Sequence, residues 1–195
     1  DHVNTSIEHI KGVIEFKNVK FAYVKNEPVL KGISFKMAAG ETVAIVGSTG
    51  AGKSTIVNSL NRLYDIDSGQ ITIDAKNVNT IALKSLRKNI AVVLQDVFLF
   101  ADTILNNITL HDPAITALQV ESAAKEIGAH DFIMSLPNGY HYNVKERGVM
   151  LSSGQRQLIS FLRAYVTRPK ILILDEATAS VDPFTEAQIQ EGLDA

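Results

Sequence analysis

The chain contains no cysteine and no tryptophan, and its 195 residues include no apolar run of membrane-spanning length. Without cysteine there can be no disulfide, no thiol chemistry and no cysteine-bound zinc, which points to a reducing compartment. A span needs about 18 or more consecutive apolar residues, and no signal-peptide pattern is present either. An excess of one charge sign is also missing, since 19 basic and 21 acidic residues give a formal net charge of −2. This balance excludes a broad basic surface for nucleic acid or anionic lipid, so an anionic ligand must be held locally.

What the sequence does contain is enough apolar residues, 46% of the chain, to build a sizeable core. Short runs that alternate apolar and polar residues cover Val13–Phe16, Val19–Tyr23 and Ile33–Met37, with breaks at Gly12, Pro28 and Gly32. Alternation with period two is typical of strands that have one buried face. The first part of the chain is therefore predicted to form an antiparallel sheet.

A continuous apolar run, "ETVAIVG" at 41–47, follows and predicts a buried strand. Directly after it, Ile56, Val57, Leu60 and Leu63 recur at helical spacing. Further strands and helices are expected at 69–74, 89–95, 116–135, 158–166 and 170–176. The pattern predicts a single α/β domain over residues 1–195, with an antiparallel β part at about 11–45, a core at about 42–95 and 166–195, and an inserted helical part at about 96–165.

The glycine-rich loop "GSTGAGKS" at 47–54 matches the pattern G-x-x-x-x-G-K-[ST], between an expected strand and an expected helix. Glycines let backbone N–H groups surround a phosphate, and the helix directs its positive end at the same anion. Lys53 would bridge the β- and γ-phosphates, and the hydroxyl of Ser54 would bind Mg²⁺. The alternative is a glycine-rich turn with a surface lysine. The nucleotide-binding residues predicted here are Thr49, Gly50, Ala51, Gly52, Lys53, Ser54 and Thr55.

Polar residues follow two other expected strands, with Gln95 after one and Asp175 and Glu176 after the other. In an open parallel sheet these strand ends lie at the ligand crevice. Asp175 is predicted to bind Mg²⁺ together with Ser54, and Glu176 to deprotonate the attacking water. Gln95 offers an amide oxygen for the metal and an amide nitrogen for the water. The catalytic residues are therefore predicted to be Glu176, Gln95 and Lys53. The alternative for each acid is a solvated strand end or a helix cap.

The stretch "LSSGQRQ" at 151–157 precedes the helix expected at 158–166. Ser152 and Gln155 have the spacing of a capping box, which accounts for a helix start. A helix that begins with serine and glycine also presents free N–H groups to an anion. Two such sites, separated by a whole helical segment, cannot easily surround one nucleotide within a single fold, but they could do so across two copies of the chain.

Together, "GSTGAGKST", Gln95, "LSSGQRQ", "ILILDEAT" and "SVD" resemble the motifs of ATP-binding cassette (ABC) ATPases, in the same order over essentially the whole chain. The resemblance is strongest to the nucleotide-binding domains of exporters. It implies a P-loop NTPase core, and a head-to-tail dimer in which the signature loop (Ser152, Ser153, Gly154 and Gln155) closes over ATP held by another domain. It also implies that Tyr23 stacks on adenine, where the alternative is a strand aromatic packed in the sheet. In the same family the loop with Glu146 and Arg147 touches the membrane domain; otherwise it would be a solvated charge cluster.

The function implied by this resemblance is hydrolysis of ATP, with Mg²⁺, to power transport. The expected partners are a second nucleotide-binding domain and the transmembrane domain of the same transporter, at the cytoplasmic face of a membrane, with no nucleic acid. The alternatives are a soluble cassette ATPase of DNA repair or translation, an import ATPase, and a catalytically inactive nucleotide sensor. A soluble enzyme would be expected to show coiled-coil insertions or a second cassette, and Glu176 argues against an inactive sensor.

Two departures from the family pattern matter. All five histidines precede Asp175, so the histidine that the family places after its glutamate is absent, and the chain is expected to be a piece of a longer polypeptide. Ser153 stands where the family signature has glycine. In exporters with two different halves, the half that keeps the glutamate often carries the altered signature. The combination of Glu176 with Ser153 therefore suggests a heterodimer with one fully active site; the alternative is that serine is simply tolerated.

Overall fold

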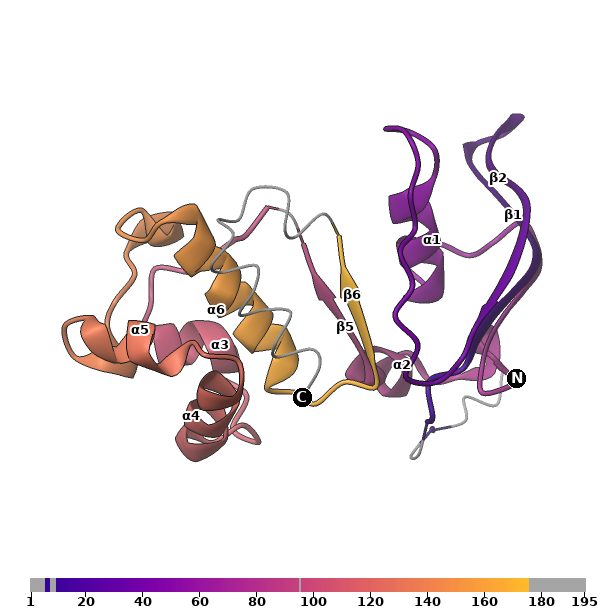
Figure 1. Ribbon diagram of the computed structural model, residues 1–195. Helices are drawn as coiled ribbons and strands as arrows, with labels where there is room; N and C mark the ends of the chain where they lie inside the picture. Colours follow the sequence, from indigo (N-terminus) through magenta and orange to yellow (C-terminus); the bar gives the residue numbers. More distant parts are fainter. Residues whose placement is uncertain (1–5, 8–9, 95, 176–195) are drawn as a thin grey trace. The chain divides into compact units, whose positions relative to one another are not determined.

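The computed structural model describes residues 6–7, 10–94 and 96–175. The chain forms two compact units, Asp1–Ile90 and Ala91–Ala195 (Figure 1). The finer division expected from the sequence, with core segments on both sides of a helical part, stays a prediction.

The first unit is built on a four-stranded sheet in the order β2-β1-β3-β4. Its strands are β1 (Ile14–Val24), β2 (Glu27–Met37), β3 (Ser68–Ile73) and β4 (Lys76–Asn77), and neighbouring strands are antiparallel. The predicted antiparallel sheet is therefore confirmed. The two runs expected before Val24 form one continuous strand, whose register shifts between Phe16 and Val19.

The breaks expected at Pro28 and Gly32 are wrong, because β2 runs through both positions. β2 is an edge strand, where the missing N–H of a proline need not remove a ladder bond. Gly32 has a φ of 94°, and a Cβ atom there would lie 2.7 Å from Oδ1 of Asn18. This glycine lets the two strands stay paired across an irregular register.

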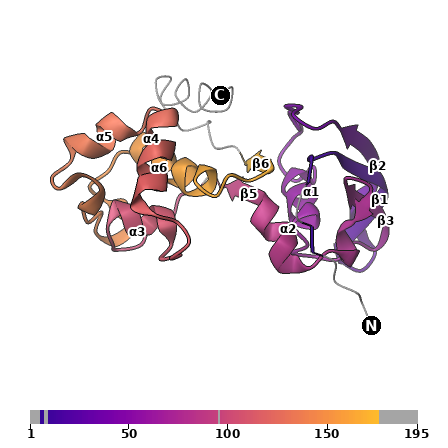
Figure 2. The same cartoon turned by 90° about the horizontal axis from the view of Figure 1, so that it is seen from below.

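Two helices complete the first unit, α1 (Lys53–Leu60) and α2 (Leu83–Asn89), with a 3₁₀ turn at Val78–Thr80. Figure 2 shows α1 alongside the sheet. α1 ends at Leu60, and the side chain of Leu63 is exposed. The helix predicted through Leu63 is therefore too long at its C-terminal end. The largest side chains fully buried in this unit are Phe16, Ile14, Leu30, Ile71, Ile73, Ile81 and Leu86.

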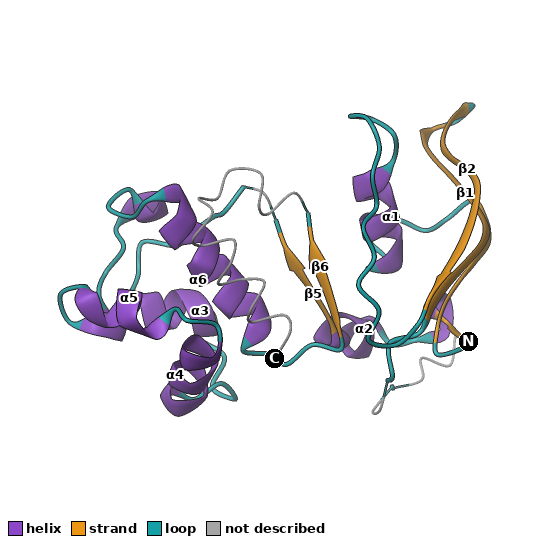
Figure 3. Cartoon of the chain, in the orientation of Figure 1, coloured by secondary structure: helices purple, strands orange, loops and turns teal. Residues whose placement is uncertain are grey.

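The strand expected at 41–47 is not formed. Residues 38–52 are loop and turn (Figure 3), and Val43, Ile45 and Val46 are 43%, 41% and 87% exposed. A strand needs a neighbour to pair with, and the sheet of the first unit holds only β1 to β4 among the described residues. An apolar run shows that a segment favours burial, but it does not specify a pairing partner.

The second unit combines helices with the paired strands β5 (Ile90–Val93) and β6 (Ile171–Leu174). The helix expected at 116–135 is two helices, separated around Gly128, whose φ of 71° is unfavourable for other residues. The helices of this unit are α3 (Ile104–Thr109), α4 (Ala117–Glu126), α5 (His130–Ser135) and α6 (Ser153–Tyr165), with 3₁₀ turns at Gly139–His141 and Glu146–Gly148. One apolar core joins α3, α4 and α6. No described helix has the length and apolar character needed to cross a membrane.

Candidate nucleotide-binding site

The glycine-rich loop of the first unit closes tightly onto the start of α1. Gly50 and Gly52 have φ values of 81° and 93°, in the left-handed region that favours glycine. A Cβ atom on Gly52 would lie 3.0 Å from the side chain of Leu30 and 3.3 Å from that of Val29. The loop therefore needs glycine at position 52 both for its conformation and for its approach to β2.

Lys53, the first residue of α1, reaches back across this loop. Its ammonium group donates to the carbonyl oxygen of Gly47 at 2.8 Å and to that of Ser48 at 3.2 Å. The loop is also closed on itself, since the N–H of Ala51 donates to the carbonyl of Ser48 at 3.1 Å. These hydrogen bonds to Gly47 and Ser48 hold the positive charge of Lys53 at the glycine-rich loop.

The start of α1 is open to an anion. Gly52 at the N-cap provides no side-chain hydrogen bond, and no acidic residue lies in the first turn. Within the described part of the chain, the N–H groups of Ser54 and Thr55 have no hydrogen-bond partner. Unpaired amides, the helix dipole and the charge of Lys53 all favour a phosphate group here. The Ser54 side chain is exposed, and its hydroxyl is an oxygen ligand of the kind that Mg²⁺ binds.

Tyr23 lies next to this helix start. It is 49% exposed, and its hydroxyl lies 3.2 Å from Oγ1 of Thr55, in the first turn of α1. Its ring makes edge-to-face contacts with Phe21 and Tyr64, at centroid distances of 4.8 and 5.1 Å. The structure thus brings Tyr23 to the glycine-rich loop as well as into an aromatic cluster. Stacking on adenine stays a prediction.

The acidic strand end lies in the second unit. The N–H of Asp175 donates to the carbonyl of Val93 at 2.9 Å, so Asp175 follows β6 where β5 ends. Its side chain is partly exposed. Gln95 and Glu176 lie outside the described residues. The predicted metal and catalytic roles of these three residues stay predictions.

The signature loop forms the helix start that its sequence predicts. The hydroxyl of Ser152 accepts from the N–H of Gln155 at 3.1 Å, and the side chain of Gln155 accepts from the N–H of Ser152 at 2.9 Å. This capping box is confirmed. Ser153 is exposed and Gly154 is buried, and neither N–H has a hydrogen-bond partner in the described part of the chain. Because the side chains of Ser152 and Gln155 each accept from the main-chain N–H of the other residue, the loop offers a ligand mainly its backbone.

The loop before the signature is strained. Lys145 and Arg147 have positive φ values of 59° and 53°. A Cβ atom on Gly148 would lie 2.9 Å from the side chain of Leu99, so position 148 needs glycine. No ion pair of Glu146 or Arg147 is found among the described residues, and both side chains are exposed, as in a solvated charge cluster. Contact with a membrane domain stays a prediction.

Sequence reasoning missed two polar side chains on α6, Gln157 and Arg163. Gln157 is only 3% exposed, and its amide nitrogen lies 3.5 Å from the carbonyl oxygen of Leu94. Arg163 donates to main-chain oxygens of residues 98 and 107. Gln157 lies on the otherwise apolar buried face of α6, and this conflict between polarity and burial was the signal that could have identified it. Arg163 is only partly buried and gave no such signal.

A loop with the pattern G-x-x-x-x-G-K-[ST] that leads into a helix with open amides is the arrangement typical of P-loop nucleotide-binding proteins. Residues 30–179 match the family model described as "ABC transporter". The chain belongs to the ABC transporter family, as a nucleotide-binding domain with the α/β P-loop fold. The predictions of family and fold class are confirmed.

Individual relatives agree. The chain is 47% identical over 188 residues to the putative multidrug export ATP-binding/permease protein YgaD of Bacillus subtilis, covering 96% of this chain and 32% of that protein. It is 50% identical over 189 residues to a putative multidrug export ATP-binding/permease protein of Staphylococcus aureus, covering 96% of this chain and 33% of that protein. The structure of a bacterial Atm1-family ABC exporter with ATP bound matches with a TM-score of 0.90 and 40% identity, over 97% of this chain and 34% of that chain. The chain therefore spans about a third of the length of its relatives.

Proposed function

We propose that this chain binds ATP with Mg²⁺ and hydrolyses it to power a membrane exporter. The observation that carries the proposal is the start of α1, where Lys53 is held against the loop carbonyls while the amides of Ser54 and Thr55 are unpaired. Phosphate release from ATP by the full-length protein is the direct test. The proposal is wrong if the folded protein releases no phosphate at any ATP concentration.

The proposed roles follow from the chemistry of each side chain. Lys53 and the amides of the glycine-rich loop bind the phosphates. Oxygen atoms of Ser54, Gln95 and Asp175 hold Mg²⁺, which would neutralise charge on the phosphates. Glu176 orients the attacking water and accepts its proton.

Two copies of the domain would share each nucleotide. The open amides of Ser153 and Gly154 at the start of α6 form a second phosphate site, and we propose that they close over ATP bound to the glycine-rich loop of another domain. The partner is a second copy or a homologous half. Binding of ATP would then join the two domains, and hydrolysis would release them.

The remaining partner is a transmembrane domain at the cytoplasmic face of a membrane. Support comes from the relatives, whose names combine an ATP-binding part with a permease part and describe multidrug export. Those names favour an exporter over a soluble cassette ATPase or an import ATPase. The exported compound stays open.

The role of Tyr23 can be tested with a ligand that lacks a base. Tyr23→Ala should weaken ATP binding about 5-fold or more, since stacking of a base on an aromatic ring contributes about 1–3 kcal/mol. Binding of inorganic tripolyphosphate should stay unchanged. Tyr23→Phe keeps the ring but loses the hydroxyl near Thr55, and it serves as the matched control with affinity close to wild type. Calorimetric titration measures all of these affinities, and equal losses for both ligands would show that Tyr23 only supports the loop.

The altered signature leads to a prediction about assembly. If the protein is one half of a heterodimer whose active site uses the signature of its partner, Ser153→Gly should leave the rate of phosphate release within about twofold of wild type. In a homodimer both sites depend on Ser153, and the rate should change clearly. Ser153 lies outside the capping pair, so the substitution leaves the cap in place. Ser152→Ala is the contrasting variant, because it removes the cap at a cost of about 1 kcal/mol. Isolation of a fully active homodimer would end the heterodimer hypothesis.

A further inference from the structure

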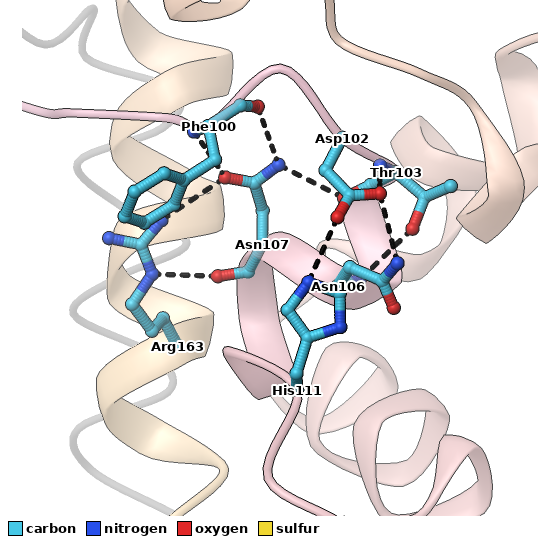
Figure 4. Close-up of polar contacts among 7 residues, drawn as sticks. All are labelled: Phe100, Asp102, Thr103, Asn106, Asn107, His111 and Arg163. Atoms are coloured by element: carbon cyan, nitrogen blue, oxygen red, sulfur yellow. Dashed lines mark hydrogen bonds and ion pairs between the residues drawn. The ribbon is translucent and has the colours of Figure 1, made fainter.

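An arginine on α6 holds the segment that follows Gln95 (Figure 4). Nε of Arg163 donates to the main-chain oxygen of Asn107 at 2.7 Å, and Nη2 donates to the main-chain oxygen of Phe98 at 3.2 Å. Nη2 also lies 3.5 Å from Oδ1 of Asn107. One planar group therefore joins α6 to both ends of the segment 98–107.

Asn107 completes the connection from the other side. Its side chain is fully buried, at 0% exposure. Its amide nitrogen donates to the carbonyls of Phe100 and Thr103, both at 3.0 Å, and its amide oxygen accepts from the N–H of Phe100 at 2.8 Å. Both polar atoms of this side chain thus form hydrogen bonds with the backbone of the segment that Arg163 contacts.

Simple stabilisation does not account for this arrangement. Burial lowers the pKa of Arg163, which means that its environment disfavours the charge. The hydrogen-bond acceptors found among the described residues are neutral amide and carbonyl oxygens, and no carboxylate is paired with it. Arg163 is partly buried, so its charge carries a desolvation cost, and an apolar side chain often stabilises such a position as well. What an apolar side chain cannot provide is a fixed geometry between α6 and two separate backbone positions.

A rigid connection between the segment and α6 would link an exposed aromatic surface on the segment to the signature loop at the start of α6. The segment presents the rings of Phe98 and Phe100, which are 54% and 53% exposed and pack edge to face at a centroid distance of 5.1 Å. α6 begins at Ser153, in the signature loop. Gln157 adds a third attachment at Leu94, directly before Gln95. α6 therefore contacts the segment at residues 98 and 107 and the strand end at Leu94, and its first turn carries the signature.

We propose that Arg163 is a positioning residue for ATP hydrolysis, which makes α6 and the segment 98–107 move as one body. A displacement of the exposed Phe98–Phe100 surface would then reorient the signature loop. This inference rests on the proposed function, because it assigns the signature loop a part in turnover. The glycine-rich loop and Tyr23, which are proposed to hold the phosphates and the base, lie in the first unit, so loss of Arg163 should affect the rate of hydrolysis more than the affinity for ATP.

The test is steady-state ATP hydrolysis by the full-length protein carrying Arg163→Gln. We expect kcat to fall about 10-fold while KM for ATP stays within about twofold, the pattern of a lost contribution to the chemical step. Arg168→Gln is the matched control. Arg168 donates to both carboxylate oxygens of Glu126 at 2.7 and 2.6 Å, so it ties the same region to α4 without touching the segment. We expect this control to keep kcat within about twofold of wild type, even where its unfolding temperature falls as far as that of Arg163→Gln.

A double-mutant cycle tests the connection itself. Arg163→Gln and Asn107→Ala should each lower kcat, and the double variant should fall no further than the worse single variant, because both remove one link. If Arg163→Gln does not fold, Arg163→Lys replaces it in the test. The lysine keeps the charge but cannot make both arginine hydrogen bonds, so its kcat should lie between that of the wild type and the roughly 10-fold loss expected for glutamine.

Three results would overturn the inference: wild-type kcat in a folded Arg163→Gln protein, an equal loss of kcat in Arg168→Gln, or additive losses in the cycle. A wild-type protein without ATPase activity would instead reject the proposed function.

Discussion

Lys53→Ala should lower the affinity for ATP by roughly 10-fold to 100-fold, since a hydrogen bond to a charged group contributes about 1.5–3 kcal/mol. Lys53 supplies a full positive charge at the glycine-rich loop, where its ammonium group lies 2.8 Å from the carbonyl of Gly47. A phosphate bound by the open amides of α1 would lose that charge and keep only partial charges. Equilibrium titration with a fluorescent ATP analogue measures the change.

The matched control for this variant is Lys84→Ala. Lys84 lies on α2 of the same unit, its side chain is exposed, and no ion pair of it is found in the described residues. Both variants change the net charge equally, so a long-range electrostatic effect would weaken binding in both. Circular dichroism checks that the loop variant stays folded. Unchanged affinity in a folded Lys53→Ala protein would reject the assignment of the phosphate loop.

Glu176→Gln should slow hydrolysis by about 10²-fold or more, which is the size of effect expected when a general base is lost. The substitution keeps the shape and hydrogen-bonding capacity of the side chain but removes its ability to accept a proton. ATP binding should be preserved, so a nucleotide-bound dimer should accumulate. Phosphate release measures the rate, and size-exclusion chromatography with and without ATP detects the dimer.

Glu121→Gln provides the comparison for loss of one carboxylate. Glu121 is a partly exposed residue of α4 whose carboxylate pairs with Lys125 at 2.7 Å, one helical turn away. Such surface pairs contribute little, so this variant should hydrolyse ATP at the wild-type rate and accumulate no more nucleotide-bound dimer than the wild type. A rate of hydrolysis in Glu176→Gln that equals wild type would exclude Glu176 as the base.

The fold could be predicted where local chemistry decides it. The capping box at Ser152 and the antiparallel strands near Phe16 depend on neighbours in sequence or on simple alternation, and both are confirmed. Continuity of β2 through Pro28 could not be predicted, because it depends on the edge position of that strand. The split of the helix at 116–135 follows from a positive φ at Gly128, which the apolar pattern does not show.

For the site, the sequence predicted the glycine turn, the lysine and the helix start of the glycine-rich loop because the motif contains its own geometry. Phosphate binding by these residues stays a prediction. The proximity of Tyr23 to Thr55 needs tertiary structure, yet the resemblance to the family had already selected this tyrosine. Arg163 and Asn107 were missed, because the partners of Arg163 include backbone oxygens more than 50 residues away, which no local pattern encodes. Nothing in a helical spacing distinguishes an arginine that binds solvent from one that binds a remote carbonyl.

The exposed run around Val43–Val46 has a consequence for handling the protein. Residues 42–52 contain no charged side chain and no proline, and the residues from Val43 to Val46 are β-branched or small. Exposed, uncharged segments of high β-propensity are templates for intermolecular strand pairing. Preparations of the first unit alone should therefore aggregate as concentration rises, and their colloidal stability should limit solution experiments before their thermodynamic stability does.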